Sequence, residues 1–345
     1  MVKNYLSRRD FDFLKYRKRF LLAALCVLLV GVVFNVVRGA KLDIKFTGGA
    51  MLKYSYSLDD TVSASDVSAS DYMKLDKGAI AGMVKEVTGQ DSTITIAQSA
   101  SAEGGTKNTI TVSMSGTKTM AEDTGDVLAE KLTAEYPRVD FAMIESNSVD
   151  ATTGSEFFGK CLMAVFLAAV FMIIYVALRF RKIGGMSAAL TAIIAIVHDC
   201  LIVYFTFVAL GFSINDNFIA VLLTIIGYSI NSTIIIYDRI RENRGIMGKK
   251  ATYAELANRS LNETLGRTIN TNLTLIMAVL TVVIVAAIYD ITSIITFAVP
   301  MLAGVIAGTY SSMFISNSLW VTWREYRDEQ LAQKKLAAFS KAKKK

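Results

Sequence analysis

Six long apolar runs divide the chain, and polar or charged segments separate them. Each run holds on the order of 20 residues, the length that an α-helix needs to cross the hydrocarbon core of a bilayer. The runs cover, in chain order, Phe20–Val37, Cys161–Leu178, Met186–Leu210, Phe218–Tyr237, Ile269–Ile288 and Ile294–Leu319. The pattern predicts a polytopic α-helical membrane protein with six transmembrane helices. The first covers residues 20–37, and the other five form a bundle over residues 158–319.

Residues 40–150 form the long segment that has no run able to span a bilayer. Alternating apolar and polar positions predict four strands there, and helical spacing predicts two helices. The predicted order is strand Ala50–Ser57, helix Ala79–Val87, strands Ser92–Ala97 and Asn108–Met114, helix Lys118–Tyr136 and strand Val139–Glu145. This is the order of a split βαβ unit, so we expect one α+β domain of ferredoxin-like fold. Residues 59–76 and the Gly104–Gly105 pair are expected to form loops.

The charge is divided unevenly between this segment and the rest. Residues 40–150 hold 10 basic and 17 acidic residues, a net charge of −7, so the remainder carries +14 to give the total of +7. The basic segments are the N-terminal residues 1–19, the loop 238–267 and the tail 324–345. Because basic residues flank membrane spans on the cytoplasmic side, we expect an extracytoplasmic α+β domain and cytoplasmic termini. The division favours a lipid bilayer and argues against nucleic acid as a partner.

The cysteines and the single histidine limit the chemistry. Cys26, Cys161 and Cys200 lie in apolar runs, at no spacing typical of a disulfide or a metal site. They are expected to pack as small apolar side chains. One histidine cannot build a zinc site made of several imidazoles, so we expect no metal. We also expect no cofactor and no enzymatic activity. Gly48–Gly49 is expected to form a turn and not a phosphate site, because no Lys-Ser/Thr pair follows it.

The fourth apolar run carries polar residues on one helical face. Thr224, Tyr228 and Asn231 are spaced to share that face, with Gly227 and Ser232 beside it. Polar side chains are costly against lipid, so this face is expected to meet protein or water. A similar stripe of Asn270, Thr271 and Thr274 continues from Arg267 in the fifth run, and the two stripes are expected to meet. The alternative is a packing seam, in which small and polar residues let helices approach closely.

Several motifs occur in a recognisable order. Gly227-Tyr228-Ser229-Ile230-Asn231 precedes Asp238-Arg239-Ile240-Arg241-Glu242-Asn243. Shorter motifs are Phe46-Thr47-Gly48-Gly49, His198-Asp199, Arg267-Thr268 and Gly308-Thr309-Tyr310-Ser311-Ser312. Over roughly residues 15–325 the chain resembles the SecF family of membrane subunits of the bacterial SecD–SecF preprotein translocase, within the resistance–nodulation–division superfamily.

The resemblance implies a subunit of the bacterial cytoplasmic membrane that assists protein export with ion-motive force. Its implied partners are a SecD homologue, a SecYEG-type channel and the translocating preprotein. In the family, a carboxylate in the fourth span and an arginine in the fifth, with a SecD carboxylate, are thought to form a proton path. Arg267 matches the arginine, but Ser232 stands where the family has Asp, and serine does not titrate near neutral pH. Lys45 also departs from the acidic residue that usually precedes Phe-Thr-Gly-Gly.

These observations give two groups of candidate residues. The ion-pathway candidates are Asp199, His198, Arg267, Asn231, Ser232 and Thr271. The motif and packing candidates are Gly227, Tyr228, Asp238, Arg239, Arg241 and Glu242. A carboxylate at membrane depth, such as Asp199, indicates function. Arg267 alternatively extends to the lipid headgroups, and His198 alternatively packs as a hydrogen-bonded core residue.

Other functions stay open at this point. The chain is alternatively an uncoupled scaffold for SecD and the channel, or half of a small-molecule exporter of the same superfamily. Coupling to sodium is a third alternative. An intramembrane hydrolase built on Ser232 and His198 is the least favoured, because a nucleophile needs a base within hydrogen-bond reach and no motif supports the pair.

Overall fold

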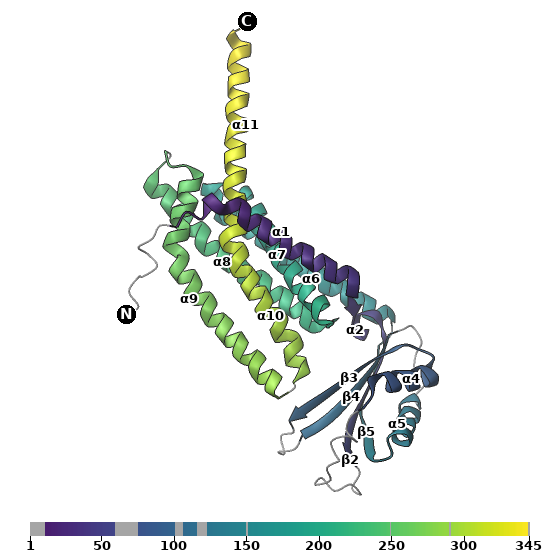
Figure 1. The fold of residues 1–345 in the computed structure, drawn as a ribbon. Coiled ribbons are helices and arrows are strands. Elements are labelled where there is room, and N and C mark those ends of the chain that lie inside the picture. Colours follow the sequence, from purple (N-terminus) through teal and green to yellow (C-terminus); the bar gives the residue numbers. More distant parts are fainter. Residues whose placement is uncertain are drawn as a thin grey trace.

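The computed structural model describes residues 11–58, 75–100, 106–115, 123–149, 151–248, 250–289 and 291–343. The predicted Gly104–Gly105 loop lies outside the described residues, as does the predicted 59–76 loop apart from Leu75 and Asp76. A helical bundle occupies the middle of the molecule, with an α+β domain at one end and a projecting C-terminal helix at the other (Figure 1).

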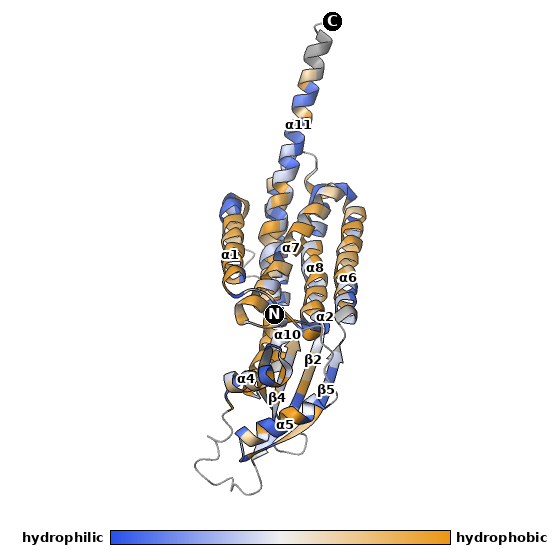
Figure 2. Ribbon diagram, turned by 90° about the vertical axis from the view of Figure 1, so that its right-hand side faces the viewer, coloured by the Kyte–Doolittle hydropathy of each residue, from blue (hydrophilic) through white to orange (hydrophobic). Residues whose placement is uncertain are grey.

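Six helical segments in the described residues are long and apolar enough to cross a membrane, so the structure has the predicted number of candidate spans. The first five are α1 (Arg17–Arg38), α6 (Ala151–Arg179), α7 (Gly185–Leu210), α8 (Asp216–Met247) and α9 (Tyr253–Ile288). The sixth combines α10 (Thr292–Tyr310), the π-helical turn η4 (Ser311–Ser316) and α11 (Asn317–Lys343). Short 3-10 turns are η2 (Leu14–Tyr16) and η3 (Arg181–Ile183). Apolar residues predominate along the bundle, whereas hydrophilic residues are frequent where α11 leaves the bundle (Figure 2).

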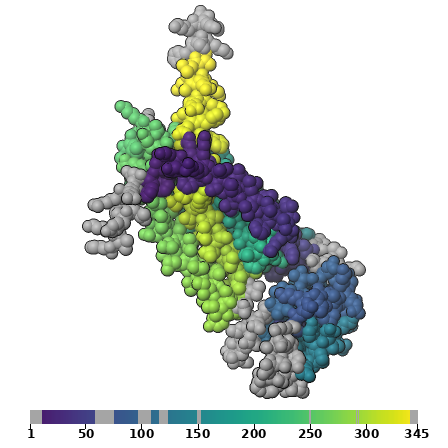
Figure 3. Space-filling model, viewed as in Figure 1, coloured from purple at the N-terminus to yellow at the C-terminus, as the bar shows by residue number. Residues whose placement is uncertain are grey.

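Helix α7 is the centre of the bundle, because α1, α6, α8 and α10 all pack against it. Glycines permit the closest approaches. A Cβ on Gly304 of α10 would lie within 2.8 Å of Ile225 and Val203, and one on Gly31 of α1 would overlap the ring of Phe205. Helix α1 lies along the outside of the bundle (Figure 3). Small residues thus set how closely these helices pack.

Helices α8 and α9 are longer than a bilayer requires, with 32 and 36 residues. The polar segment Tyr253–Leu265 is helical. It is the first part of α9, which continues without a break to Ile288. Thr252 caps the start with a reciprocal bond to Glu255. The change from polar to apolar residues near Arg267 changes the helix's surroundings and not its backbone, because no proline or turn sequence interrupts it.

The α+β domain contains the predicted elements in the predicted order. They are β2 (Gly49–Leu58), α4 (Lys77–Thr88), β3 (Ser92–Ala100), β4 (Thr106–Ser115), α5 (Thr124–Glu135) and β5 (Val139–Val149). The sheet has the order β3-β4-β2-β5, and every neighbouring pair is antiparallel. Its inner face buries Leu52, Tyr54, Ile110 and Val112 with Leu128 of α5. The strand alternation places these side chains on the face that the helices cover.

A small junction joins this domain to the bundle, and the sequence pattern did not predict it. Strand β1 (Lys41–Leu42) pairs in parallel with β6 (Ser213–Ile214), which precedes α8. The short helix α2 (Ile44–Thr47) follows, and Lys45 Nζ lies 2.5 Å from Asp216 Oδ2. The Lys45 side chain, which departs from the SecF pattern, therefore has an acidic partner. Its pKa lies above the ordinary value because of the hydrogen bond to Asp216, against the opposing effect of partial burial.

Candidate functional site

Asp199 lies in the middle of α7 and is completely buried. Its Oδ2 atom accepts hydrogen bonds from Ser229 Oγ at 2.6 Å and from Ser311 Oγ at 2.7 Å. Its Oδ1 atom lies 3.0 Å from Nδ1 of the neighbouring His198. A buried carboxyl group is very costly unless it is hydrogen-bonded, and three partners satisfy this one. Asp199 therefore joins three spans: α7, α8 and the sixth.

The π-helical turn η4 brings Ser311 to this position. A π-turn widens the helix and leaves carbonyls without their usual partners, and such turns are frequent at functional sites. Asn317 compensates: its Nδ2 donates to Ser312 O at 2.8 Å and to Met313 O at 3.2 Å. Gly308 lies beside the same carboxyl group, where a Cβ would be 3.6 Å from Asp199 Oδ2. The motif Gly308–Ser312 thus surrounds Asp199 from the sixth span.

A second polar contact joins the same three spans. The Tyr237 hydroxyl of α8 lies 2.7 Å from Thr191 Oγ1 of α7 and 2.6 Å from Ser316 Oγ of η4. All three side chains are buried. The positions Thr191 and Tyr237 each lie eight residues, about two helical turns, from Asp199 and Ser229. Two polar clusters at different depths therefore hold α7, α8 and the sixth span together.

His198 is buried between α7 and the helices beside it, with 7% of its surface exposed. It borders an apolar cleft of about 450 Å³ that also touches Ala24 and Val27 of α1 and Ala307 and Tyr310 of α10. One nitrogen contacts Asp199, so the imidazole belongs to the Asp199 cluster. Ser232 is buried elsewhere on α8, and its Oγ donates to Tyr228 O at 3.3 Å. The two side chains do not pair in the described structure, which leaves the hydrolase alternative without geometric support.

The predicted meeting of polar stripes on α8 and α9 is made by different residues. The Tyr228 hydroxyl donates to Asn272 Oδ1 at 2.5 Å and joins the two helices within their apolar part. Thr224 and Thr274 are exposed and bond to carbonyls of their own helices instead. Asn231 and Thr271 are exposed as well. The rotation of each helix about its axis decides which polar residues meet, and here it turns both stripes toward the outside of the chain.

Two buried polar atoms of α9 at this contact have no hydrogen-bond partner within the described residues, namely Thr268 Oγ1 and Asn272 Nδ2. A third such atom, Thr233 Oγ1, lies one helical turn from Ser229, on the face of α8 that carries the bond to Asp199. Thr268 and Asn272 are one turn apart on α9, and α8 runs in the opposite direction beside it. Buried polar groups usually have a partner, so a further hydrogen-bonding group, such as a water molecule, is expected at these positions.

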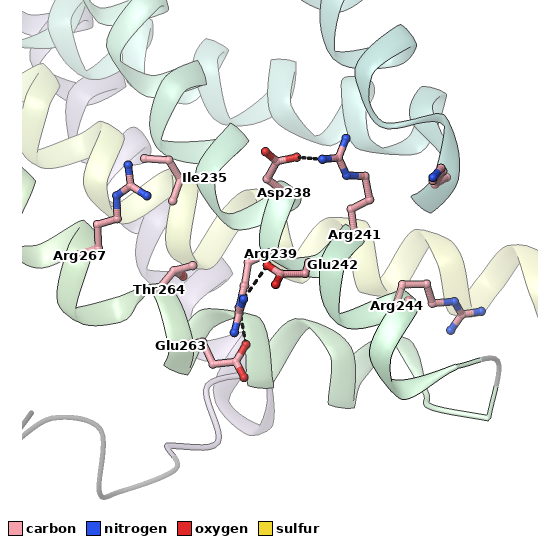
Figure 4. A pocket seen from close by; sticks show the side chains of 11 residues that line it. Ile235, Asp238, Arg239, Arg241, Glu242, Arg244, Glu263, Thr264 and Arg267 are labelled. Carbon is pink, nitrogen blue, oxygen red and sulfur yellow. Dashed lines mark hydrogen bonds and ion pairs between the residues drawn. The ribbon is translucent and has the colours of Figure 1, made fainter.

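A charged groove of about 950 Å³ lies where α8 leaves the apolar region and α9 begins. It contains the four charged motif residues, which form ion pairs (Figure 4). Arg239 bonds to Glu242 and Glu263, each at 2.6 Å, and Arg241 lies 2.9 Å from Asp238. Asn243, which is fully buried, donates to Glu263 at 2.6 Å and ties the end of α8 to α9.

Arg267 lies at the edge of this groove, apart from the ion-pair network. In Figure 4 it is near Ile235, and the described residues give it no ion pair. It is exposed on the first part of α9. Thr268 follows Arg267 directly, and its buried Oγ1 atom has no hydrogen-bond partner among the described residues. The groove therefore borders the polar part of the α8–α9 contact.

The structure brings some sequence candidates together and separates others. Asp199 and His198 form one cluster, whereas Arg267, Asn231 and Thr271 lie on the outer surface of α8 and α9. Sequence reasoning did not select Ser229 and Ser311 as carboxylate partners, although both lie in the motifs. No sequence signal relates their depth in the membrane to that of Asp199.

Comparison with known proteins shows the family. Residues 128–326, more than half of the chain, match the family described as "Protein export membrane protein SecD/SecF, C-terminal". The SecF protein translocase subunit of Thermodesulfovibrio yellowstonii is 32% identical over 90% of this chain and 94% of its own length. The SecF subunit of Alicyclobacillus acidocaldarius is 40% identical over 52% of this chain and 57% of that protein.

A solved structure has the same fold over most of the chain. The crystal structure of SecDF, a translocon-associated membrane protein from Thermus thermophilus, superimposes with a TM-score of 0.73 at 26% identity. The match covers 93% of this chain and 40% of the SecDF chain, so this chain corresponds to a part of that longer protein. The family match over residues 128–326, the relative that matches 90% of the chain and the shared fold agree: the chain belongs to the SecD/SecF family of protein export membrane proteins.

Proposed function

We propose that this chain is a SecF-like subunit that assists protein export across the bacterial cytoplasmic membrane, together with a SecD homologue, and uses ion-motive force. The observation that carries the proposal is the Asp199 cluster. The chain has Ser232 at the family's Asp position, yet Asp199 of α7 is bonded to Ser229 of the same motif. A carboxyl group thus lies beside the fourth span, although a neighbouring helix supplies it.

The polar atoms between α8 and α9 support an ion path to this carboxyl group. The proposed path begins at the charged groove beside Arg267 and continues past Thr268, whose hydroxyl has no partner in the described structure. It then follows the bond between Asn272 and Tyr228 and reaches Ser229, the next residue on α8, which donates to Asp199. Chains of water and hydroxyl groups can transfer protons, so these positions support proton coupling.

The outward-facing polar residues support a membrane partner. Thr224 and Asn231 of α8 and Arg267, Asn270 and Thr271 of α9 are exposed on this chain. Polar and charged groups are costly against lipid, so a second protein surface or water is expected there. The solved SecDF chain has a larger remainder beside this part, since the match covers 40% of that chain. A SecD homologue is therefore the proposed partner, beside a SecYEG-type channel and the preprotein.

The charge division supports the orientation. The −7 charge of residues 40–150 and the basic segments 1–19, 238–267 and 324–345 favour an extracytoplasmic domain and cytoplasmic termini. We also propose that this domain is ferredoxin-like, for which the strand order β3-β4-β2-β5 and the positions of α4 and α5 are the support.

The test measures proton-gradient-driven export by membrane vesicles that contain the chain with its SecD homologue. We expect Asp199→Asn and Arg267→Ala to abolish the response to the gradient. Ser232→Asp restores the family pattern, so we expect it to rescue part of the response in the Asp199→Asn background. Glu156→Gln is the matched control, because Glu156 is an exposed carboxylate on α6 paired only with Lys160 among the described residues.

The alternatives predict other results. If both removals leave gradient-driven export unchanged, the chain is an uncoupled scaffold. If activity is lost on removing sodium at a constant proton gradient, sodium is the coupling ion. If no SecD homologue purifies with the chain and export does not depend on it, the small-molecule exporter replaces the proposal.

A further inference from the structure

We infer that strand β3 binds an extended segment of unfolded polypeptide, which adds to the sheet of the α+β domain as a further strand. The inference rests on the proposed function, which places this domain on the side where an exported chain emerges. It concerns a site far from the membrane cluster, on the free edge of the sheet (Figure 1).

Strand β3 is an end strand of the sheet. It pairs with β4 along its full length, from Ser92 opposite Met114 to Ala100 opposite Thr106. Within the described ranges, no other strand pairs with it. In an antiparallel strand, alternate residues direct their N–H and C=O groups away from the paired neighbour. The outer side of β3 is therefore a row of backbone donors and acceptors available to another strand.

The two edges of the sheet differ in how they are protected. Natural proteins protect free edges with charged residues, proline, bulges or very short strands. The other edge strand, β5, carries Asp140 and Glu145. The nine residues of β3 contain neither a charged residue nor a proline. The unprotected edge is therefore the β3 edge, and unprotected edges are the ones that accept strands.

The side chains next to this edge would give an added strand two different faces. On the side of the helices, Ile96 of β3 and Met83 of α4 are partly buried at the rim of the core. On the open side, Thr93 and Thr95 are exposed. An incoming segment would thus place alternate side chains against apolar groups and against hydroxyls. Segments that alternate apolar and polar residues should bind best.

Strand addition fits the chemistry of export. Main-chain hydrogen bonds provide affinity with little dependence on sequence, and shallow side-chain contacts add modest preference. A subunit that handles many unfolded chains needs recognition of this kind. The competing occupant is an edge strand of the partner subunit's own outer domain, and the experiment distinguishes the two.

The test uses the full chain with its SecD homologue in membrane vesicles, with an export substrate arrested by a folded C-terminal domain. A photoreactive benzoylphenylalanine replaces Thr95, and a matched control places it at Ala142, which is exposed on β5. We expect an adduct between the Thr95 position and the arrested substrate, several-fold stronger than from Ala142. The adduct should disappear when the substrate is released.

A second pair of variants tests the edge by charge. Thr93→Lys places a protecting lysine on β3, and Ala142→Lys places one on the edge that is already charged. We expect the Thr93→Lys variant to weaken the Thr95 adduct several-fold, whereas Ala142→Lys leaves it unchanged. Limited proteolysis of both variants checks that the domain remains folded.

Three outcomes would overturn the inference: an adduct with the SecD homologue instead of the substrate, equal adducts from both edges, or no adduct. The proposed function fails separately, when vesicles without this chain export at the normal rate. Normal dependence of export on the chain, together with no substrate adduct at β3, would reject the inference alone.

Discussion

Replacing Asp199 tests both the geometry and the chemistry of the buried cluster. Asp199→Asn keeps the shape of the side chain but removes its ability to exchange a proton. Hydrogen bonds to a charged group contribute roughly 1.5–3 kcal/mol net, and bonds between neutral groups contribute about 1 kcal/mol. For the two serine bonds, Asp199→Asn should therefore reduce the free energy of unfolding by roughly 1–4 kcal/mol if the carboxyl group is ionised, and by less if it is protonated.

Asp199→Ala has a different effect, because it leaves the serines without their acceptor. Ser311 retains a second acceptor, Gly308 O at 3.3 Å, whereas Ser229 has none in the described structure. An unsatisfied buried hydroxyl costs about 1–3 kcal/mol. The additional Ser229→Ala substitution should therefore recover part of the loss caused by Asp199→Ala.

The measurement is a double-mutant cycle of Asp199→Ala and Ser229→Ala, with denaturant unfolding in detergent. Contacting residues show coupling energies of roughly 0.5–3 kcal/mol. The control is a cycle of Glu156→Gln and Ser229→Ala, for which no coupling is expected. Coupling near zero for the first cycle would refute the contact. Full gradient-driven export by Asp199→Asn would refute the proton role even if the contact were present.

Three further predictions concern the junction, the packing and the orientation. Lys45→Met removes the ion pair with Asp216. The Lys45 side chain is 52% exposed, so the substitution should reduce the free energy of unfolding by at most about 1 kcal/mol. The pKa of Lys45 is raised above its ordinary value of 10.5, so the stability that the ion pair contributes is present below pH 10.5 and is lost as pH rises through the folded-state pKa. A difference in Tm between wild type and variant that persisted unchanged far above that pKa would contradict the ion pair. Gly304→Ala should cost about 1–3 kcal/mol by overpacking against Ile225 and Val203, whereas Gly227→Ala, whose Cβ would meet nothing within 4 Å, should be neutral or stabilising in the same unfolding assay. Protease added outside spheroplasts should cleave within residues 40–150 and spare the tail 324–345, and cleavage of the tail alone would reverse the proposed orientation.

The sequence by itself determined the spans and the strand and helix order of the α+β domain. Apolar runs of bilayer length predict helices because the backbone must satisfy its own hydrogen bonds in hydrocarbon. Alternation in β2, β3 and β4 predicts strands with one buried face, because successive side chains point to opposite sides. The motifs likewise identified the family that the comparisons show. The junction of β1 with β6 was not predictable, because two-residue strands carry no periodicity.

Only the tertiary structure decided which polar residues meet in the membrane. Ser229 and Ser311 lie 30 and 112 residues from Asp199 in sequence, yet both donate to its Oδ2 atom. Helical periodicity gives the face on which a residue lies, but neither the rotation of one helix relative to another nor their relative depth. Thr224 and Thr271 therefore face outward while Tyr228 and Asn272 make the contact. Packing at glycines such as Gly304 and the π-turn η4 set those rotations and depths, and local sequence does not encode them.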